Sequence, residues 1–515
     1  MRVVPKIFSA EIDGIDAECI EVEADLNVGL HSFNIVGLAD KAVSEAKERV
    51  NSALKNSGIK PPSRENRKIT INLAPADIKK AGSRFDLPIA VAYLLATGQI
   101  RPFDTSGKIF VGELSLDGNV RPINGVLSIA RLAARIGFKE IFVPSENCAE
   151  AAVVESIRAF PVRSLQALLD HFESRNTINP MPRPNIVPSR PPSGVSIDDI
   201  RGQDAAKRAL TIAAAGGHNI LLSGPPGTGK TMLAEALASI LPPPSHEEIL
   251  EITQIHSIAG FTAKDTPFIC WRPFRSPHHS ASTVSIIGGG ANPKPGEISL
   301  AHRGILFLDE LPEFHKDVLE SLRQPLEDGT VRVARAKKSV SFPARFMLAA
   351  AMNPCPCGYF EDAEKECSCT AHEILRYQKK ISGPLLDRID IQIHVPRIPI
   401  ADLRVPRDAT QSTSPAIVEK ISAARALQRS RFSSAKIPIH SNSEMSSKTV
   451  DAMIQLDNSA ETFLKYALEK SFISPRGYYR ALKVAQTIAD IDGALSIKKE
   501  HLAEAFHYRL KTETY

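Results

Sequence analysis

The pattern of hydrophobic and polar positions predicts a first domain over residues 1–175. Apolar and polar residues alternate in Lys68-Ile69-Thr70-Ile71-Asn72-Leu73, as they do in a half-buried strand. Residues 87–95 and 126–134 repeat instead with a helical period. This mixture predicts an α+β domain. Its end is marked at residues 176–196, where repeated prolines among polar residues exclude a helix or a central strand and predict a linker.

A different pattern follows the linker. Over residues 197–396, short apolar runs alternate with helical periods, which is typical of a parallel α/β sheet. Residues 397–515 are helical by periodicity, notably over 461–470, 475–490 and 497–510. The chain is therefore expected to hold an α/β core with a C-terminal helical lid, preceded by the α+β domain.

A glycine-rich loop lies at the start of the α/β region. It follows the apolar run Asn219-Ile220-Leu221-Leu222, precedes a helical pattern, and consists of Gly224, Pro225, Pro226, Gly227, Thr228, Gly229, Lys230 and Thr231. Glycines let backbone N–H groups surround phosphates, the lysine adds a mobile charge, and the threonine hydroxyl is a Mg²⁺ ligand at a helix N-terminus. This loop, called the phosphate loop below, predicts binding of a nucleoside triphosphate with Mg²⁺.

Two later apolar runs end in polar side chains. Ile305-Leu306-Phe307-Leu308 is followed by Asp309 and Glu310, so a buried strand would deliver two carboxylates at its C-terminal edge. Asp309 is predicted to hold the Mg²⁺ shell and Glu310 to activate the attacking water. The run ending at Met352 is followed by Asn353, a predicted water-positioning group. The alternatives are a solvated turn for the two acids and a simple turn start for the asparagine.

Four of the seven cysteines are crowded together. Cys355, Cys357, Cys367 and Cys369 form two Cys-x-Cys pairs separated by nine residues. Four thiolates at paired spacing favour a tetrahedral structural Zn²⁺ without a free coordination position. Because Cys-x-x-Cys is the commoner spacing, free or redox-active thiols are the alternative. The other three cysteines, Cys19, Cys148 and Cys270, are expected to be small buried side chains.

The order of these motifs resembles that of a known family. The phosphate loop, Leu306-Phe307-Leu308-Asp309-Glu310, Met352-Asn353-Pro354, a Ser382-to-Asp390 segment and Ser474-Pro475-Arg476-Gly477 are similar to the series in magnesium-chelatase-like AAA+ ATPases. In detail the chain looks like the ComM/YifB branch, whose known activity is ATP-driven branch migration on DNA by a ring during uptake and recombination.

The resemblance assigns further roles. It implies a homo-hexamer in which Arg388 is the finger that completes a neighbour's ATP site and Arg476 is a second sensor that reaches its own site. Gln203 lies where the family surrounds the adenine of ATP. A planar guanidinium suits phosphate oxygens, and a finger supplied in trans can accelerate hydrolysis by orders of magnitude. Both arginines have ordinary surface or salt-bridge roles as the alternative.

The segment between the phosphate loop and the Asp-Glu strand is longer than a minimal P-loop unit needs. Part of this insertion, residues 271–290, can line the pore of a ring, and its His278-His279 pair is expected to be packed or hydrogen-bonded rather than metal-binding. Residues 330–342 predict a hairpin with a basic tip, and DNA phosphates are the expected partners of Arg335, Lys337 and Lys338. A charged, solvated edge turn is an equal alternative.

The N-terminal domain resembles the protease domain of Lon, an S5-like α+β fold. The resemblance rests on residues 79–88 and 111–123, and it places Arg84 at the position of the catalytic serine and Leu127 at that of the lysine. Neither side chain can carry out nucleophilic attack on a peptide. We therefore expect a non-proteolytic scaffold that binds DNA through Lys79, Lys80 and Arg84 or helps ring assembly, with solvated surface charge as the alternative for these residues.

Composition limits the remaining possibilities. The 515 residues are 43% hydrophobic, with a net charge of +5 that permits a polyanionic partner without demanding one. Neither a membrane-spanning run nor a secretory leader is evident, so a cytoplasmic location is expected. The leading hypothesis is a hexameric ATPase that uses ATP, Mg²⁺ and structural Zn²⁺ to drive branch migration on branched or single-stranded DNA during natural transformation. The alternatives are a chelatase motor subunit for porphyrin metallation and a nucleotide-gated scaffold.

Overall fold

The computed structural model describes residues 4–64, 66–191, 194–263, 265–290, 292–334, 339–398, 413–470 and 474–509. These residues form two compact units. The first comprises Met1–Val187 and Ile249–Ile269, and the second comprises Pro188–Glu248 and Cys270–Tyr515. The chain passes from one to the other within the proline-rich segment, where residues 177–191 form neither helix nor strand.

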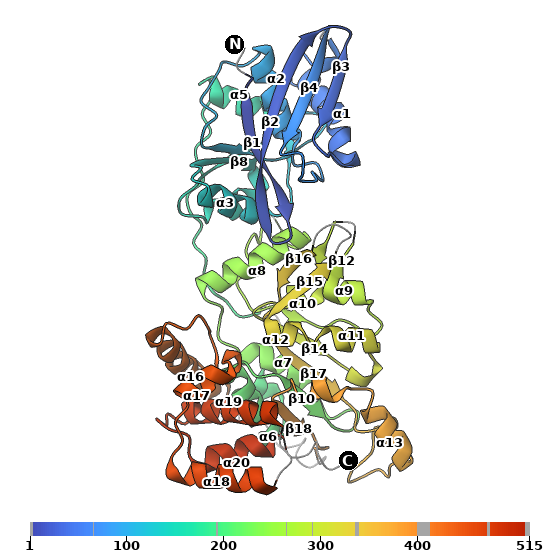
Figure 1. Cartoon of the computed structure of the whole chain (residues 1–515), viewed down its shortest axis with the longest axis vertical. Coiled ribbons are helices and arrows are strands. Elements are labelled where there is room, and N and C mark those ends of the chain that lie inside the picture. The colour runs from blue at the N-terminus through green and yellow to red at the C-terminus, as the bar shows by residue number, and fades with distance from the viewer. Residues whose placement is uncertain are drawn as a thin grey trace. The chain divides into compact units, whose positions relative to one another are not determined.

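The first unit is built on a mixed seven-stranded sheet in the order β3-β4-β2-β1-β5-β8-β9 (Figure 1). Strands β1, β2 and β4 pair antiparallel, whereas β5, β8 and β9 pair parallel. The strand predicted over residues 68–73 forms β4, the second strand from one edge of this sheet. The strands are β1 (Lys6–Asp13), β2 (Asp16–Val28), β3 (Ser32–Val36), β4 (Arg67–Ala74), β5 (Lys108–Phe110), β8 (Glu140–Pro144) and β9 (Arg158–Val162).

Helices bury apolar side chains against this sheet in two clusters. One cluster includes Ile7 of β1 with residues of α1, α2 and α5, and the other includes Ala10 of β1 with residues of α3 and α4. Alternate β1 residues therefore enter different cores, as strand geometry requires. The helices are α1 (Lys41–Asn56), α2 (Asp86–Thr97), α3 (Val126–Arg135), α4 (Cys148–Ala152) and α5 (Leu165–Phe172). A short hairpin, β6 (Glu113–Leu114) with β7 (Val120–Arg121), lies in the same unit.

Part of the insertion beyond the phosphate loop packs in this first unit. Residues Ile249–Ile269 hold most of helix α8 (His246–Ala259). Gln254 donates to the carbonyl of Ile15 at 2.8 Å, and the Ser257 hydroxyl accepts from Gly125 N–H at 3.0 Å and donates to Glu150 at 2.5 Å. The sequence predicted a boundary at the linker but gave no sign that a later segment belongs with the first domain.

The second unit is centred on a parallel five-stranded sheet in the order β11-β14-β17-β10-β18. Side chains of β14 alternate between two cores, with Phe307 in one and Leu308 in the other, so the sheet is covered on both faces. The strands are β10 (Ile220–Ser223), β11 (Phe274–Arg275), β14 (Ile305–Leu308), β17 (Met347–Met352) and β18 (Ile391–His394). Two-stranded additions are β12 (Gly288–Gly289) with β13 (Lys294–Pro295), and β15 (Thr330–Ala334) with β16 (Ser339–Pro343).

Helices of the C-terminal region share one core with the sheet. Ala485 and Ile488 of α19 are buried in the cluster that also contains Ile220 and Leu222 of β10. Helices earlier in the unit are α6 (Asp204–Gly216), α7 (Lys230–Ile240), α9 (Thr283–Ile287), α10 (Glu297–Leu300), α11 (Lys316–Ser321), α12 (Pro325–Asp328), α13 (Ala371–Gln378) and α14 (Gly383–Leu386). The C-terminal helices are α16 (Ser414–Ser434), α17 (Ser447–Met453), α18 (Asn458–Lys470), α19 (Pro475–Ile491) and α20 (Lys499–His507) (Figure 1). In the part of the chain described here, every helix is too short or too polar to span a bilayer.

Candidate active site

The phosphate loop connects strand β10 to helix α7, as its sequence predicts. Gly229 caps α7 with φ of 84°, a left-handed conformation that glycine adopts without strain. At Gly224 a side chain is excluded by space, because an added Cβ would lie 2.2 Å from the carbonyl oxygen of Val395. Glycine is therefore required at these two positions for different reasons: Gly229 allows the left-handed turn, and Gly224 lets two backbone segments approach each other.

Lys230 is held at the mouth of this loop. Its Nζ donates to the carbonyl oxygens of Gly224 and Pro225 at 2.7 and 2.8 Å, and to Oδ1 of Asn353 at 3.1 Å. Burial lowers the pKa of Lys230 to about 8, although the charges of Asp309 and Glu310 act in the opposite direction. A buried ammonium whose partners are mostly neutral oxygens favours an incoming anion such as a phosphate group.

The two predicted carboxylates follow β14 at the C-terminal edge of the sheet. Asp309 Oδ2 accepts from the Thr231 hydroxyl at 2.8 Å, so the two predicted Mg²⁺ ligands already contact each other. Glu310 adopts a left-handed backbone, with φ of 52°, and its N–H donates to Asp309 Oδ1 at 2.9 Å. The turn directs the two acids differently, because Asp309 reaches the phosphate loop while Glu310 remains exposed.

Asn353 and His279 complete the surroundings of these acids. Strand β17 lies between β14 and β10, so Asn353 at its end is brought to the phosphate loop and bonds Lys230. His279 Nδ1 lies 3.3 Å from Glu310 Oε2, and its ring lies 4.1 Å from that of His278. His278 bonds Ser280 at 2.8 Å. The sequence predicted a packed or hydrogen-bonded histidine pair but not its contact with Glu310, since no local spacing connects residues so far apart.

Gln203, predicted near the adenine, precedes helix α6. It has a left-handed backbone with φ of 55°, and its side-chain amide donates to the carbonyl oxygen of Pro396 at 2.6 Å. This bond connects the start of α6 to the segment after β18. Its role toward the adenine stays a prediction.

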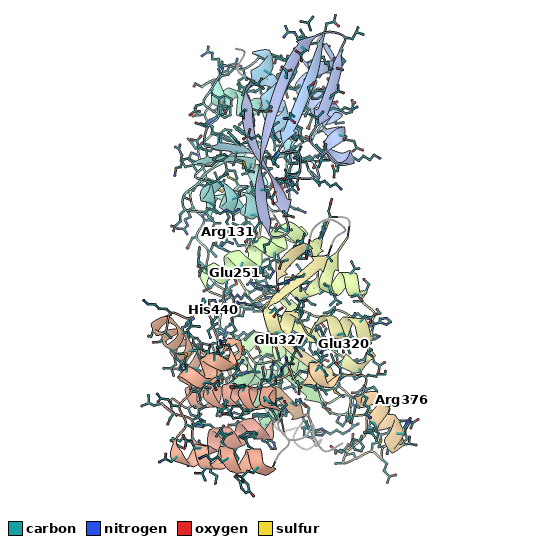
Figure 2. The ribbon with its side chains drawn as sticks, viewed as in Figure 1. Arg131, Glu251, Glu320, Glu327, Arg376 and His440 are labelled. Atoms are coloured by element: carbon teal, nitrogen blue, oxygen red, sulfur yellow. The ribbon has the colours of Figure 1, made fainter. Side chains whose placement is uncertain are left out.

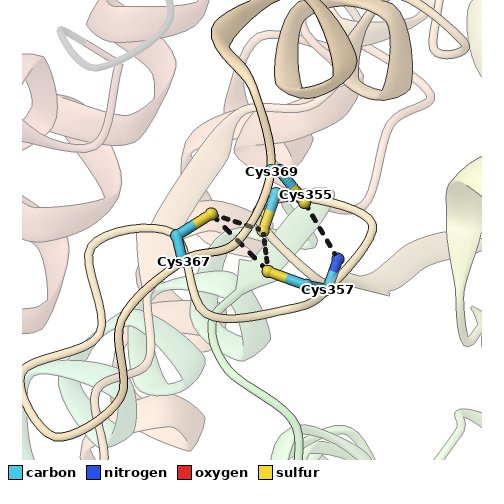
Figure 3. Close-up of side chains that lie close together, drawn as sticks. All are labelled: Cys355, Cys357, Cys367 and Cys369. Carbon is cyan, nitrogen blue, oxygen red and sulfur yellow. Dashed lines mark hydrogen bonds between the residues drawn. The ribbon is translucent and has the colours of Figure 1, made fainter.

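The four clustered cysteines converge as their spacing suggests (Figure 3). Their sulfur atoms all lie within 4.8 Å of one another, with Sγ–Sγ distances of 3.3 Å between Cys355 and Cys357 and 3.7 Å between Cys355 and Cys367. Ligands about 2.3 Å from a tetrahedral Zn²⁺ lie about 3.8 Å apart, so the arrangement fits this ion. The loop also touches the phosphate loop: a Cβ added at Gly358 would lie 2.8 Å from Pro226. Of the other cysteines, Cys148 is buried, whereas Cys19 and Cys270 are partly exposed.

The two arginines assigned by resemblance share one carboxylate. Arg388 is 7% exposed and pairs with Glu327, and Arg476 Nη2 lies 3.4 Å from the other oxygen of Glu327. Arg480 lies nearby, donating to the Arg388 carbonyl oxygen at 2.9 Å. The structure brings both guanidinium groups into one cluster around Glu327. The roles that the resemblance gives them, Arg388 at a neighbour's ATP site and Arg476 at its own, stay predictions.

The residues expected to carry charge on the N-terminal domain differ in exposure. Lys79 is exposed, but Lys80 is completely buried and donates to the carbonyl oxygen of Pro75. Contrary to the prediction, Lys80 is therefore not available to bind DNA. Arg84 is mostly buried and lies 3.8 Å from Glu11. Leu127, at the lysine position of the Lon pattern, is also buried. These contacts give Lys80 and Arg84 structural roles within the first unit.

The predicted hairpin forms: β15 and β16 pair antiparallel, with Thr330 opposite Pro343 at one end and Ala334 opposite Ser339 at the other. Its basic tip, with Arg335, Lys337 and Lys338, lies outside the described residues. Contact of this tip with DNA therefore stays a prediction.

The fold and site define a magnesium-chelatase-type P-loop ATPase. Residues 196–403 match the family described as magnesium chelatase, subunit ChlI, and residues 22–147 and 411–509 match two further models of that subunit, the latter its C-terminal part. The phosphate loop, the Asp-Glu strand and the four cysteines all fall within the first of these matches.

Within that class, the chain belongs to the ComM/YifB family. It is 42% identical over 511 residues to competence protein ComM of Haemophilus influenzae, covering 98% of this chain and 97% of that protein. It is also 42% identical over 500 residues to YifB of Salmonella typhimurium, covering 96% and 95%. The 67 kDa magnesium-chelatase subunit of Heliobacterium mobile is 30% identical over 183 residues, covering 30% and 27%. The first two similarities therefore include both compact units.

Proposed function

We propose that this protein is a ring-forming, ATP-hydrolysing DNA motor that promotes branch migration when incoming DNA is recombined. The observation that carries the proposal is the complete hydrolytic arrangement at one sheet edge, in a chain similar over nearly its whole length to a competence protein. The matching part of the chelatase subunit is much shorter. This difference favours a DNA role over porphyrin metallation.

Each side chain has a distinct task in the proposed reaction. Lys230 moves from the carbonyl oxygens to the phosphates of ATP, while Thr231 and Asp309 would hold Mg²⁺. The bound ion neutralises charge on the phosphate oxygens. Glu310 orients the attacking water and accepts its proton. Asn353 senses the γ-phosphate through its shared contact with Lys230.

The shared carboxylate supports a revised role for Arg476. Because Arg388 and Arg476 both pair with Glu327, a neighbour's triphosphate that attracts one guanidinium also meets the other. We propose that both arginines serve the neighbouring ATP site and that Glu327 holds them when no nucleotide faces them. Hydrolysis then requires a subunit boundary, as expected for a ring.

ATP turnover with and without branched DNA tests the proposal. We expect branched DNA to stimulate turnover of the wild type, and Glu310→Gln to abolish both basal and stimulated turnover while ATP binding remains. In a joint DNA molecule, the branch point should move, and so separate the joined duplexes, only with the active protein and ATP. A rate of ATP turnover that neither branched nor single-stranded DNA changes would exclude a DNA motor and favour the chelatase-type alternative.

A further inference from the structure

The second unit contains a charged cavity that is separate from the phosphate loop. It has a volume of about 690 Å³ and is lined by residues of the ATPase core and of the C-terminal helices, with no residue of the phosphate loop among them. Eight arginine or lysine side chains line it against five carboxylates. Figure 2 labels two of the lining residues, Glu327 and His440. The cavity therefore carries an excess of positive charge.

One end of this cavity is the Glu327 cluster already described. Arg388 Nε is buried there without a hydrogen-bond partner among the described residues. Arg480 is balanced by Asp390, at 2.5 Å. This end is the one that the proposed function assigns to a neighbouring subunit.

The other end is formed by Arg345, Arg425 and Lys483, and we call it the Arg425 end. Arg345 pairs with Glu444 at 2.9 Å. In contrast, the other two cations donate hydrogen bonds to neutral oxygens: Arg425 donates to the Ala214 carbonyl at 2.9 Å, and Lys483 donates to the Ser443 carbonyl at 3.0 Å. A carbonyl oxygen satisfies a donor but does not neutralise its charge.

Burial lowers the pKa values of both cations, and the nearby carboxylates do not fully offset it. Burial, and then the charge of Arg272, lowers the pKa of Arg425 to about 10, while the charges of Glu248 and Glu444 act in the opposite direction. Burial lowers the pKa of Lys483 to about 8, with Arg480 acting in the same direction and Asp390 and Glu444 opposing it. An anion bound at this end would restore the ordinary preference of both groups for their charged forms.

We propose that the Arg425 end binds the phosphate groups of a small phosphorylated ligand, at a site distinct from the hydrolytic one. The cavity volume lies within the range of about 300–1,000 Å³ that is usual for small-molecule sites. Arginine and lysine are the side chains that recognise phosphate. Because Arg345 comes from the ATPase core and Arg425 and Lys483 come from C-terminal helices, the occupant joins these two parts.

Calorimetric titration with inorganic triphosphate tests this site. A Lys230→Ala protein is used, because its hydrolytic sites, and thus the boundary sites of any ring, no longer bind triphosphate tightly. We expect about one triphosphate bound per protomer, and at least about tenfold weaker binding after Lys483→Met or Arg425→Gln is added. Lys420→Gln is the matched control: it removes an exposed lysine of the helix that carries Arg425 and should leave the affinity unchanged.

Further titrations identify the recognised chemistry. ADP should bind and adenosine should not, if phosphate groups are recognised. Retained thermal stability of each variant shows that weaker binding does not result from unfolding. Triphosphate that fails to bind the Lys230→Ala protein, or that binds equally well after Lys483→Met, would overturn the proposal. Neither result depends on DNA or on turnover, so the proposed motor function would remain.

Discussion

Lys230 is the residue on which nucleotide binding depends, and its environment makes its charge sensitive to pH. It is buried, and its Nζ donates to three oxygens, two of the phosphate loop and one of Asn353. Its two acidic neighbours do not fully offset the cost of burying the ammonium, as the lowered pKa shows. An incoming triphosphate supplies the missing negative charge and so favours protonation.

ATP affinity should therefore decrease as pH rises through the pKa of Lys230. The ammonium is the form that binds phosphate, and its pKa of about 8 in the free protein means that most lysines are neutral at pH 9. We expect ATP to bind about tenfold more weakly at pH 9 than at pH 7, with proton uptake on binding. Calorimetry in buffers of different ionisation enthalpy measures both. An affinity that does not change over this range would contradict the assignment.

His279 is expected to position the catalytic carboxylate. Its Nδ1 lies 3.3 Å from Glu310, and its ring packs on His278. His279→Phe retains the ring but removes the polar contact, so kcat should fall about tenfold while KM for ATP changes little, since no phosphate contact is lost. His278→Phe is the control, because that histidine bonds Ser280 instead. Equal effects of the two substitutions would mean that His279 only packs.

These residues also show what a sequence makes visible. Lys230, Thr231, Asp309 and Glu310 are recognisable because each belongs to a short motif with its own chemistry. His279 is not, because its partner lies in another motif and their contact depends on how the sheet and the insertion fold. The correction of Lys80 has the same origin, since a lysine has no sequence pattern that distinguishes a buried side chain from a solvated one.

The four-cysteine loop connects metal binding to nucleotide binding at the level of the element. It follows Asn353, and Gly358 within it lies against Pro226 of the phosphate loop. Within the same loop, the Phe360 N–H donates to Cys355 Sγ at 3.3 Å. A metal that fixes the four sulfur atoms would therefore also fix one wall of the ATP site.

Loss of zinc should weaken ATP binding. Cys357→Ser, or incubation with a chelator, should remove the metal and raise the Kd for ATP about three- to tenfold, because the wall formed by Gly358 is no longer held in place. Elemental analysis and nucleotide titration are the measurements, and Cys19→Ser is the control outside the cluster. Freshly purified wild type that contains no zinc would remove the basis for this account.

Elements were predictable where a local pattern decides them. The apolar runs before the phosphate loop, Asp309 and Asn353 are the strands β10, β14 and β17, because a strand buried on both faces needs continuous apolar residues. Helices α2 and α3 follow their periodicity in the same way. The sheet order β11-β14-β17-β10-β18 has no such local signal and depends on long-range packing.

At the scale of the whole molecule, two findings lie beyond the reach of local patterns. Residues Ile249–Ile269 belong to the first unit although a phosphate-loop helix precedes them in the chain. Arg388 and Arg476 meet at Glu327 although 87 positions separate them in the sequence. Both depend on tertiary packing.

The central claim is that hydrolysis requires residues of two subunits, and mixing inactive variants tests it most directly. Glu310→Gln and Arg388→Ala proteins should each be inactive, whereas their equimolar mixture should regain up to about a quarter of wild-type ATP turnover, because some boundaries then combine an intact Glu310 with a neighbour's Arg388. A mixture of Arg388→Ala and Arg476→Ala should stay inactive, because both arginines come from the same subunit.

The measurement is steady-state ATP turnover of each mixture against its two components alone. The account predicts recovery in the first mixture and none in the second. Full activity of Arg388→Ala by itself, or no recovery when it is mixed with Glu310→Gln, would contradict hydrolysis at a subunit boundary.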